Sequence, residues 1–179
     1  DGESKPEGER VQIRANLDCR ELNEYVYQTH EPIPTSEELR HKLRGSNRFT
    51  TLDMVHSFHQ FVLEEKARKL FTFRAPGGLY RYKRLVMGNN PASSEAHKRV
   101  KMALEGCTGV CQIKDDVLVY GTGAEHDDRV REVLNRFREA GLTLRREKCY
   151  MGQEKVKWFG MIYSAQGMTA DPAKTEVIS

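Results

Sequence analysis

The stretch GVCQIKDDVLVYGTG (109–123) constrains the fold of this chain more than any other. Two short apolar runs, Val110–Ile113 and Val117–Tyr120, flank the adjacent acids Asp115 and Asp116. Each run is too short for a helix and is rich in β-branched residues, so the pattern predicts a β-hairpin with the acid pair at its bend. Two adjacent carboxylates repel each other, and burial against a sheet would increase that repulsion.

A divalent cation would relieve this repulsion. Two such metals, held roughly 3.5–4 Å apart, need several hard oxygen ligands in one place and can drive in-line phosphoryl transfer. Because two aspartates are too few for such a site, a third acid is expected at a strand end. Asp53 is the best candidate, since it closes the predicted strand RFTTLD (48–53). An ordinary exposed turn pair is the alternative interpretation of Asp115 and Asp116.

Other acids and histidines are further candidates for a functional site. Asp127 and Asp128 also adjoin, but they precede an amphipathic helix and are assigned to its N-terminal dipole. His56 and His59 could bind a metal, yet no third ligand at helical spacing accompanies them. No Ser/His/Asp order and no glycine-rich phosphate loop stands out in the sequence.

The remaining pattern predicts an α+β fold, because helices and antiparallel strands are intermixed. Thr35 and Glu38 have the spacing of a capping box for a short helix that ends near Leu43. Longer helices are expected over about 92–104 and 126–140. Further strands are expected at 11–17, at HQFVL (59–63), on either side of the turn PGG (76–78), and in KVKWFGMIYS (155–164).

Composition places few further limits on the chain. Its 179 residues suit one domain, and 29 Lys and Arg against 26 Asp and Glu fit a nucleic-acid partner without requiring one. The four cysteines show no CxxC or zinc-finger spacing, which favours a reduced, intracellular protein, and no apolar run has the length of a membrane span. The sequence starts without Met and ends inside a predicted helix, so we expect a piece of a longer polypeptide.

Several stretches, taken in order, resemble the reverse transcriptase of gypsy-type LTR retrotransposons and, more distantly, that of retroviruses. They are IRANLDCRELN, EPIPTSEEL, FTTLDMVHSFHQ, TFRAPGGLYRYKRL, MGNNPAS, IKDDVLVYG, REAGLTLRREKC and VKWFGMIYS. The first ten residues are polar and are expected to form a flexible lead-in. The resemblance implies that 11–179 form the fingers and palm of a right-hand polymerase. That part would end at the primer-grip hairpin and the start of the thumb, with an antiparallel palm sheet backed by helices.

The resemblance also implies an activity. Asp53, Asp115 and Asp116 would form the catalytic triad and bind two Mg²⁺ ions, with Mn²⁺ as an alternative. Asp53 and Asp115 would bridge both metals. The enzyme would extend a primer on an RNA or DNA template with deoxynucleoside triphosphates. The parent polyprotein would add RNase H and integrase and would function without a membrane, inside the cell, in a cytoplasmic virus-like particle.

Further site residues are implied by the same resemblance, each with a plainer alternative such as an exposed strand arginine, core packing or a packed aromatic strand. They are Arg14, contacting the triphosphate; Met54 and Val55, offering backbone N–H groups to phosphate; Phe58, excluding a 2′-hydroxyl; Met87, touching the nucleotide; and Trp158, Phe159 and Gly160, forming the primer grip.

Three departures from the family pattern leave other interpretations open. Ile113 stands where an aromatic is usual, LVMG puts Met87 in place of Phe or Gln, and Ala96-His97 replaces Phe-Gln. They favour a catalytically weak or inactive, domesticated module that binds nucleic acid or protein, whereas the intact acids favour the polymerase. A two-metal nuclease is a further alternative. From a chain with no thumb, we expect weak or no processive synthesis.

Overall fold

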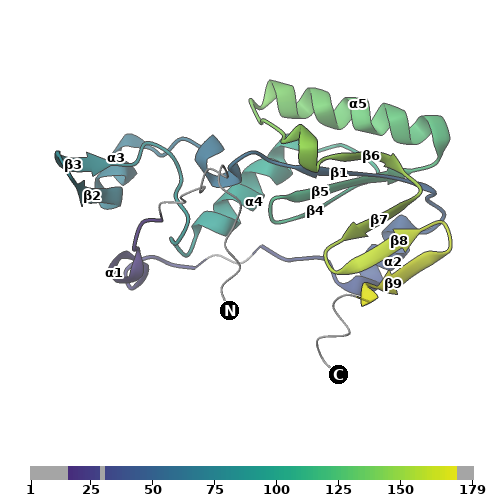
Figure 1. The fold of residues 1–179 in the computed structure, drawn as a ribbon, viewed down its shortest axis with the longest axis horizontal. Helices are drawn as coiled ribbons and strands as arrows, with labels where there is room; N and C mark the ends of the chain where they lie inside the picture. Colours follow the sequence, from purple (N-terminus) through teal and green to yellow (C-terminus); the bar gives the residue numbers. More distant parts are fainter. Residues whose placement is uncertain (1–15, 29–30, 173–179) are drawn as a thin grey trace, which may run out of the picture.

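The computed structural model describes residues 16–28 and 31–172, and a four-stranded antiparallel sheet organises its larger part (Figure 1). The strand order is β4-β5-β1-β6. The bounds are Arg48–Asp53 for β1, Val110–Ile113 for β4, Asp116–Gly121 for β5 and Tyr150–Gln153 for β6. β1 therefore lies in the middle of the sheet although it comes first in the chain.

Helices cover one face of this sheet. α4 (Ala92–Ala103) and α5 (Gly123–Glu139) pack there, and α5 runs along the top of the view in Figure 1. The cluster beneath them joins Leu52, Val117 and Val119 of the sheet to Val100 of α4 and to Val133 of α5, with further residues of both helices. These side chains alternate along the strands with those of the opposite face, as the period of a strand requires.

The opposite face is covered by α2 (Ser36–Leu43) and by a second, three-stranded sheet. That sheet has the order β7-β8-β9, with bounds Lys155–Trp158, Met161–Ser164 and Gly167–Ala170. Phe49 and Leu118 of the central sheet pack against Leu43 of α2 and against Trp158 and Tyr163, among others. The central sheet is thus buried on both faces over most of its length.

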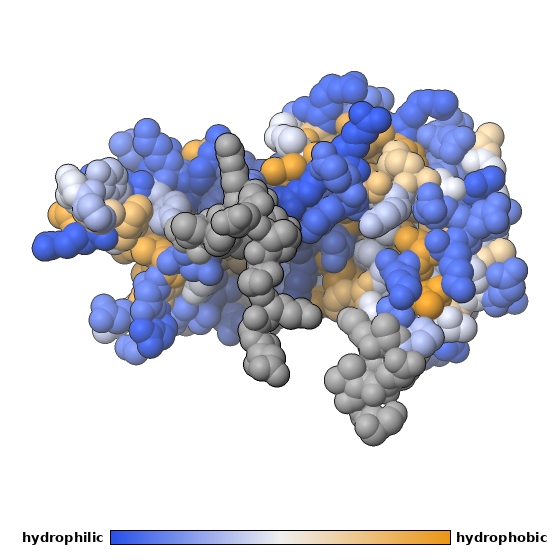
Figure 2. All heavy atoms as spheres, in the orientation of Figure 1, coloured by the Kyte–Doolittle hydropathy of each residue, from blue (hydrophilic) through white to orange (hydrophobic). Residues whose placement is uncertain are grey.

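A smaller part lies at the left of Figure 1, around the hairpin β2–β3 (Thr72–Ala75 and Gly78–Arg81). Short helices of the chain are α1 (Arg20–Asn23), η1 (Ser57–Gln60), α3 (Glu65–Arg68), η2 (Lys69–Phe71), which directly precedes β2, and η3 (Arg146–Lys148), which precedes β6. Hydrophilic residues cover most of the visible face, with hydrophobic patches near β2 and β3 (Figure 2). Every helix of the described residues is too short or too polar to cross a lipid bilayer.

Most predicted elements are confirmed. The α+β class, the acidic hairpin, the PGG hairpin, the helix over 92–103 and the paired strands of 155–164 all occur. Thr35 and Glu38 form the predicted capping box, with reciprocal hydrogen bonds of 3.2 and 2.9 Å. The strand predicted at 11–17 falls mostly outside the described residues.

Two predictions are wrong. HQFVL is not a strand: Ser57–Gln60 is a 3₁₀ turn, and beyond it only Val62 forms an isolated bridge, to Arg84. The α5 helix begins at Gly123, not near 126, so Asp127 and Asp128 lie in its second turn. Both acids have local partners instead of the helix end, since Asp127 bonds to His126 at 3.1 Å and Asp128 pairs with Arg131 at 2.7 Å.

Candidate functional site

Strand pairing brings the predicted acids together. Asp53 is the last residue of β1 and Asp116 the first of β5, and their Cα atoms are register partners. Directly opposed residues point to the same face, with Cβ atoms typically about 4.5–5.5 Å apart. Ile113 and Asp116 are the closing pair of the β4–β5 hairpin, and Asp115 is the second of the two loop residues between them. The strand geometry thus unites an early acid with the late doublet.

The pKa of Asp116 shows that the three acids interact electrostatically. The protein around the Asp116 carboxyl removes water from it and raises the pKa of Asp116, although part of this side chain remains exposed. The charges of Asp115 and then Asp53 raise that pKa further, while Lys148 lowers it. Like charges directly opposite each other in a sheet destabilise it, so this arrangement has no benefit for stability alone.

Neighbouring groups hold the backbone and one side chain of this acid cluster. The Ser57 hydroxyl donates to Asp115 Oδ2 at 3.1 Å, and the Arg145 N–H donates to the Asp53 carbonyl at 2.8 Å. Ser57 follows His56, whose φ of 45° lies in the left-handed region. Sequence reasoning missed Ser57, because a single serine in a short turn carries no recognisable signal.

The chemistry of the donors fits a hard divalent cation, because all three side chains are carboxylates, the ligands that Mg²⁺ prefers. Burial is the main cause of the raised pKa of Asp116, and the negative charges of Asp115 and Asp53 add to it; a bound cation would oppose both effects. As the side chains stand, no group of three or more His, Cys, Asp and Glu within 16–28 and 31–172 is arranged to hold a metal ion.

Met54 and Val55, the two residues after Asp53, are expected from the sequence to present backbone N–H groups to phosphate. Met54 is buried in the helix-side core and forms an isolated bridge to Leu144. The Val55 N–H donates to the Thr143 carbonyl at 3.0 Å. This does not match the expectation that Val55 presents a free N–H to phosphate, because the neighbouring Thr143 segment already occupies the donor.

Phe58 and Met87 differ in their exposure to solvent. Phe58 is partly buried and packs against the cluster of Leu85, Ala92 and Ala96. Met87 is 43 % exposed, which leaves its side chain free to contact a ligand. Arg14, the predicted triphosphate contact, lies outside the described residues.

The predicted primer-grip residues form the tip of the β7–β8 hairpin. Trp158 and Met161 are the closing pair, and the two loop residues, Phe159 and Gly160, have φ of 47° and 76°. A bulky residue at positive φ is uncommon and strained. Trp158 is buried, but Phe159 is 52 % exposed, so the strained turn presents an aromatic ring to solvent.

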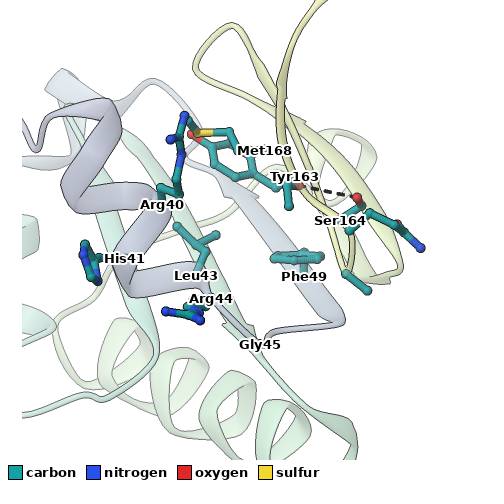
Figure 3. A pocket seen from close by; sticks show the side chains of 12 residues that line it. Arg40, His41, Leu43, Arg44, Gly45, Phe49, Tyr163, Ser164 and Met168 are labelled. Atoms are coloured by element: carbon teal, nitrogen blue, oxygen red, sulfur yellow. Dashed lines mark hydrogen bonds between the residues drawn. The ribbon is translucent and has the colours of Figure 1, made fainter.

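Two other features are a pair of histidines and a pocket. The His56 and His59 rings are 6.2 Å apart, and His59 stacks near Tyr82. A pocket of about 340 Å³ lies between α2 and the β8–β9 hairpin, bordered by Arg40 and Arg44 and by the Tyr163 ring (Figure 3).

Comparison with known proteins gives a consistent result. A family model described as "Reverse transcriptase (RNA-dependent DNA polymerase)" matches residues 3–163. An uncharacterized Caenorhabditis elegans protein is 30 % identical over 94 % of this chain, and the retrovirus-related Pol polyprotein from Drosophila melanogaster transposon 412 is 28 % identical over 98 %. The Tf2-3 transposon polyprotein of Schizosaccharomyces pombe is 30 % identical over 88 %. The chain spans only 13, 14 and 12 % of the lengths of these three relatives.

Solved structures show the same fold. A foamy viral protease–reverse transcriptase in complex with double-stranded DNA matches with a TM-score of 0.83 and 19 % identity, over 92 % of this chain and 29 % of that one. The native crystal structure of the prototype foamy virus protease–reverse transcriptase matches with a TM-score of 0.74 and 23 % identity, over 84 % of this chain and 21 % of that one. The palm and fingers architecture expected from the sequence is therefore confirmed.

Proposed function

Because this chain belongs to the reverse transcriptase (RNA-dependent DNA polymerase) family, we propose that it carries the polymerase centre of a retrotransposon Pol polyprotein. The reaction is the transfer of a nucleotide from a deoxynucleoside triphosphate to the 3′-hydroxyl of a primer on an RNA or DNA template. The observation that carries this proposal is the register pairing of Asp53 with Asp116, beside Asp115.

In this proposal Asp53, Asp115 and Asp116 hold two Mg²⁺ ions, or Mn²⁺ in their place. Bound metals would activate the attacking hydroxyl and neutralise charge on the leaving pyrophosphate. The carboxylates would come together by rotation of their side chains, since the strands already fix their backbones in register. The Ser57 hydroxyl, which donates to Asp115, orients one of these carboxylates.

The residues around the acids would position the substrates. Phe58 of η1, which packs against Leu85 and against Ala92 and Ala96 of α4, would form the wall beneath the sugar and select deoxynucleotides. Met87 would contact the incoming nucleotide, and Arg14 its triphosphate. The exposed ring of Phe159, at the tip of the Trp158–Gly160 turn, would support the primer end.

The partners proposed for this centre are a template-primer duplex and deoxynucleoside triphosphates. The transposon Pol polyprotein among the relatives supports a parent polyprotein of the gypsy type, with RNase H and integrase as further domains. Since this chain covers about an eighth of such relatives, the activity of the whole polyprotein is part of the proposal.

Single-nucleotide incorporation tests the proposal without requiring processive synthesis. The 179-residue chain is incubated with a labelled template-primer, one complementary deoxynucleotide and Mg²⁺ or Mn²⁺. We expect Asp115→Asn to lower the rate by at least about 100-fold, because the group acts directly at the charge that develops in the transition state. Asp128→Asn, which changes the other acidic doublet, is the matched control and should leave the rate unchanged.

The possible outcomes separate the alternatives. Equal incorporation by the wild type and by Asp115→Asn would refute the polymerase assignment. Binding of the template-primer without incorporation by either protein would favour the nucleic-acid-binding module. Shortened primers would indicate the two-metal nuclease instead.

A further inference from the structure

A histidine of α4 contacts the turn that carries the acid doublet. His97 is 6 % exposed, and its Nδ1 accepts a hydrogen bond from the Lys114 N–H at 3.2 Å. Lys114 directly precedes Asp115. His97 of α4 therefore contacts the backbone of the turn directly, although it lies 17 residues before Lys114 in the sequence.

A glutamine forms a second link between the same helix and the same turn. Gln112 Nε2 donates to the His97 carbonyl at 3.0 Å and to the Lys114 carbonyl at 2.8 Å. The N–H of Lys114 is thus held by the His97 ring, and its C=O by an amide that the His97 backbone anchors. Both polar backbone groups of this one residue are restrained from α4.

Lys114 needs such restraint because of its backbone conformation. Its φ is 55°, a region that costs a residue with a side chain about 1–2 kcal/mol relative to the right-handed regions. Two-residue hairpin loops often require a positive φ, and glycine usually supplies it. With lysine at this position, the contacts from His97 and Gln112 offset the cost of the turn.

The contact depends on a neutral imidazole. For Nδ1 to accept, the ring must carry its single proton on Nε2. Burial lowers the pKa of His97, which favours this neutral form at neutral pH. His97 lines a broad groove between α4 and the 31–38 segment.

We propose that His97 is a positioning residue of the acidic turn, which holds Lys114 at positive φ and thereby sets the direction of the Asp115 and Asp116 carboxylates. This inference rests on the proposed function for its consequence, the binding of divalent metal. His97 acts through Lys114 and touches neither substrate nor metal.

Amide hydrogen exchange of Lys114, followed by NMR on the 179-residue chain, tests the restraint directly. His97→Ala should raise the exchange rate of the Lys114 N–H by at least about 10-fold, because its acceptor is lost. His97→Asn should restore protection, since Asn Oδ1 is as many bonds from the backbone as Nδ1 and also accepts. An unchanged Lys114 exchange rate in His97→Ala would overturn the proposal.

Mn²⁺ titration followed by electron paramagnetic resonance tests the consequence. Loss of a group that orients metal ligands typically lowers affinity about 10–100-fold, so His97→Ala should bind Mn²⁺ at least about 10-fold more weakly while His97→Asn stays near wild type. Val100→Ala, a buried change one turn along α4, controls for general loss of packing. An equal loss of affinity in Val100→Ala would overturn the positioning role.

The two proposals fail in distinguishable ways. If Asp115→Asn binds Mn²⁺ as well as the wild type, the metal site of the proposed function fails, and exchange at Lys114 still decides whether His97 holds the turn. If Asp115→Asn loses the ion but His97→Ala keeps full affinity, the metal site stands and the inference about His97 fails.

Discussion

The two ends of the central sheet differ in whether their polar groups have hydrogen-bond partners or face like charges. Toward the end that begins β1, Thr50 is fully buried and bonds to His126 of α5 at 3.0 Å, and it also accepts from the Gly152 N–H at 2.9 Å. At the other end of the same strand, Asp53 meets a second aspartate. The two positions are three residues apart, about 10 Å along a strand. Polar groups are neutralised by partners at one end, and like charges accumulate at the other.

The two buried histidines, His126 and His97, also differ in which ring nitrogen accepts a hydrogen bond. The His126 Nδ1 lies 3.1 Å from Asp127 Oδ1 and its Nε2 lies 3.0 Å from the Thr50 hydroxyl, so in the neutral ring Nδ1–H donates to the carboxylate and Nε2 accepts. In His97 the roles are reversed, because Nδ1 accepts from the turn. One ring completes a chain of paired groups inside the fold, while the other holds a strained loop beneath exposed acids. From this difference we expect the first end to serve stability and the acidic end to serve the proposed function.

Removing His126 is the strongest challenge to this division. His126→Ala should lower the free energy of unfolding by about 2–4 kcal/mol, because a 99 % buried ring leaves a cavity and Thr50 loses a partner. Denaturant unfolding of the variant measures the loss. His41→Ala, at an exposed position on α2, is the matched control and should change stability by less than about 0.5 kcal/mol.

Activity decides whether the division is real. Nucleotide incorporation per folded molecule should be the same for His126→Ala as for the wild type, in contrast to Asp115→Asn. A specific loss of incorporation in His126→Ala, at a temperature where it is folded, would place function at both ends of the sheet.

A substitution at the acidic end of the sheet should raise the stability of the fold, whereas His126→Ala lowers it. A raised pKa means that ionised Asp116 destabilises the fold; the cost is full above the folded pKa and disappears as the pH falls through it toward the ordinary value of 3.8. Asp116→Asn should therefore raise the stability at pH 7, by less than about 1 kcal/mol because solvent screens a partly exposed group. The gain should shrink as the pH is lowered in thermal unfolding measured between pH 7 and 4.

Asp18 supplies the matched control for that pH dependence. Its hydrogen bonds from Arg20 lower the pKa of Asp18 to about 2, so the ionised form is favoured in the folded chain. This contribution is present above the ordinary value and is lost as the pH falls toward 2. Asp18→Asn should slightly lower the Tm at pH 7, and a gain there equal to that of Asp116→Asn would contradict the interpretation of both aspartates.

Local patterns predicted the acid end well and left its supports hidden. Short β-branched runs indicated the hairpin, and repulsion within the doublet led to Asp53 at a strand end. Both signals are local in sequence, or follow from charge alone. The contacts of His97 with Lys114 and of Ser57 with Asp115 join residues 17 and 58 positions apart, and no periodicity encodes them. The 3₁₀ turn at Ser57–Gln60 was missed for the same reason, because Gln60 bonds across the fold to Thr143.

The smallest expected effect concerns a polar atom that belongs to neither end. Within the described residues the Tyr163 hydroxyl is buried without a hydrogen-bond partner, beside the pocket between α2 and β8–β9. Burial also raises the pKa of Tyr163, so the hydroxyl stays protonated and its desolvation is uncompensated. Tyr163→Phe keeps the ring that packs on Trp158 and removes only that cost, so stability should be unchanged or rise by up to about 1 kcal/mol. A loss above about 1 kcal/mol in denaturant unfolding would show that this hydroxyl has a partner in solution, and that polar pairing extends beyond the Thr50 end of the sheet.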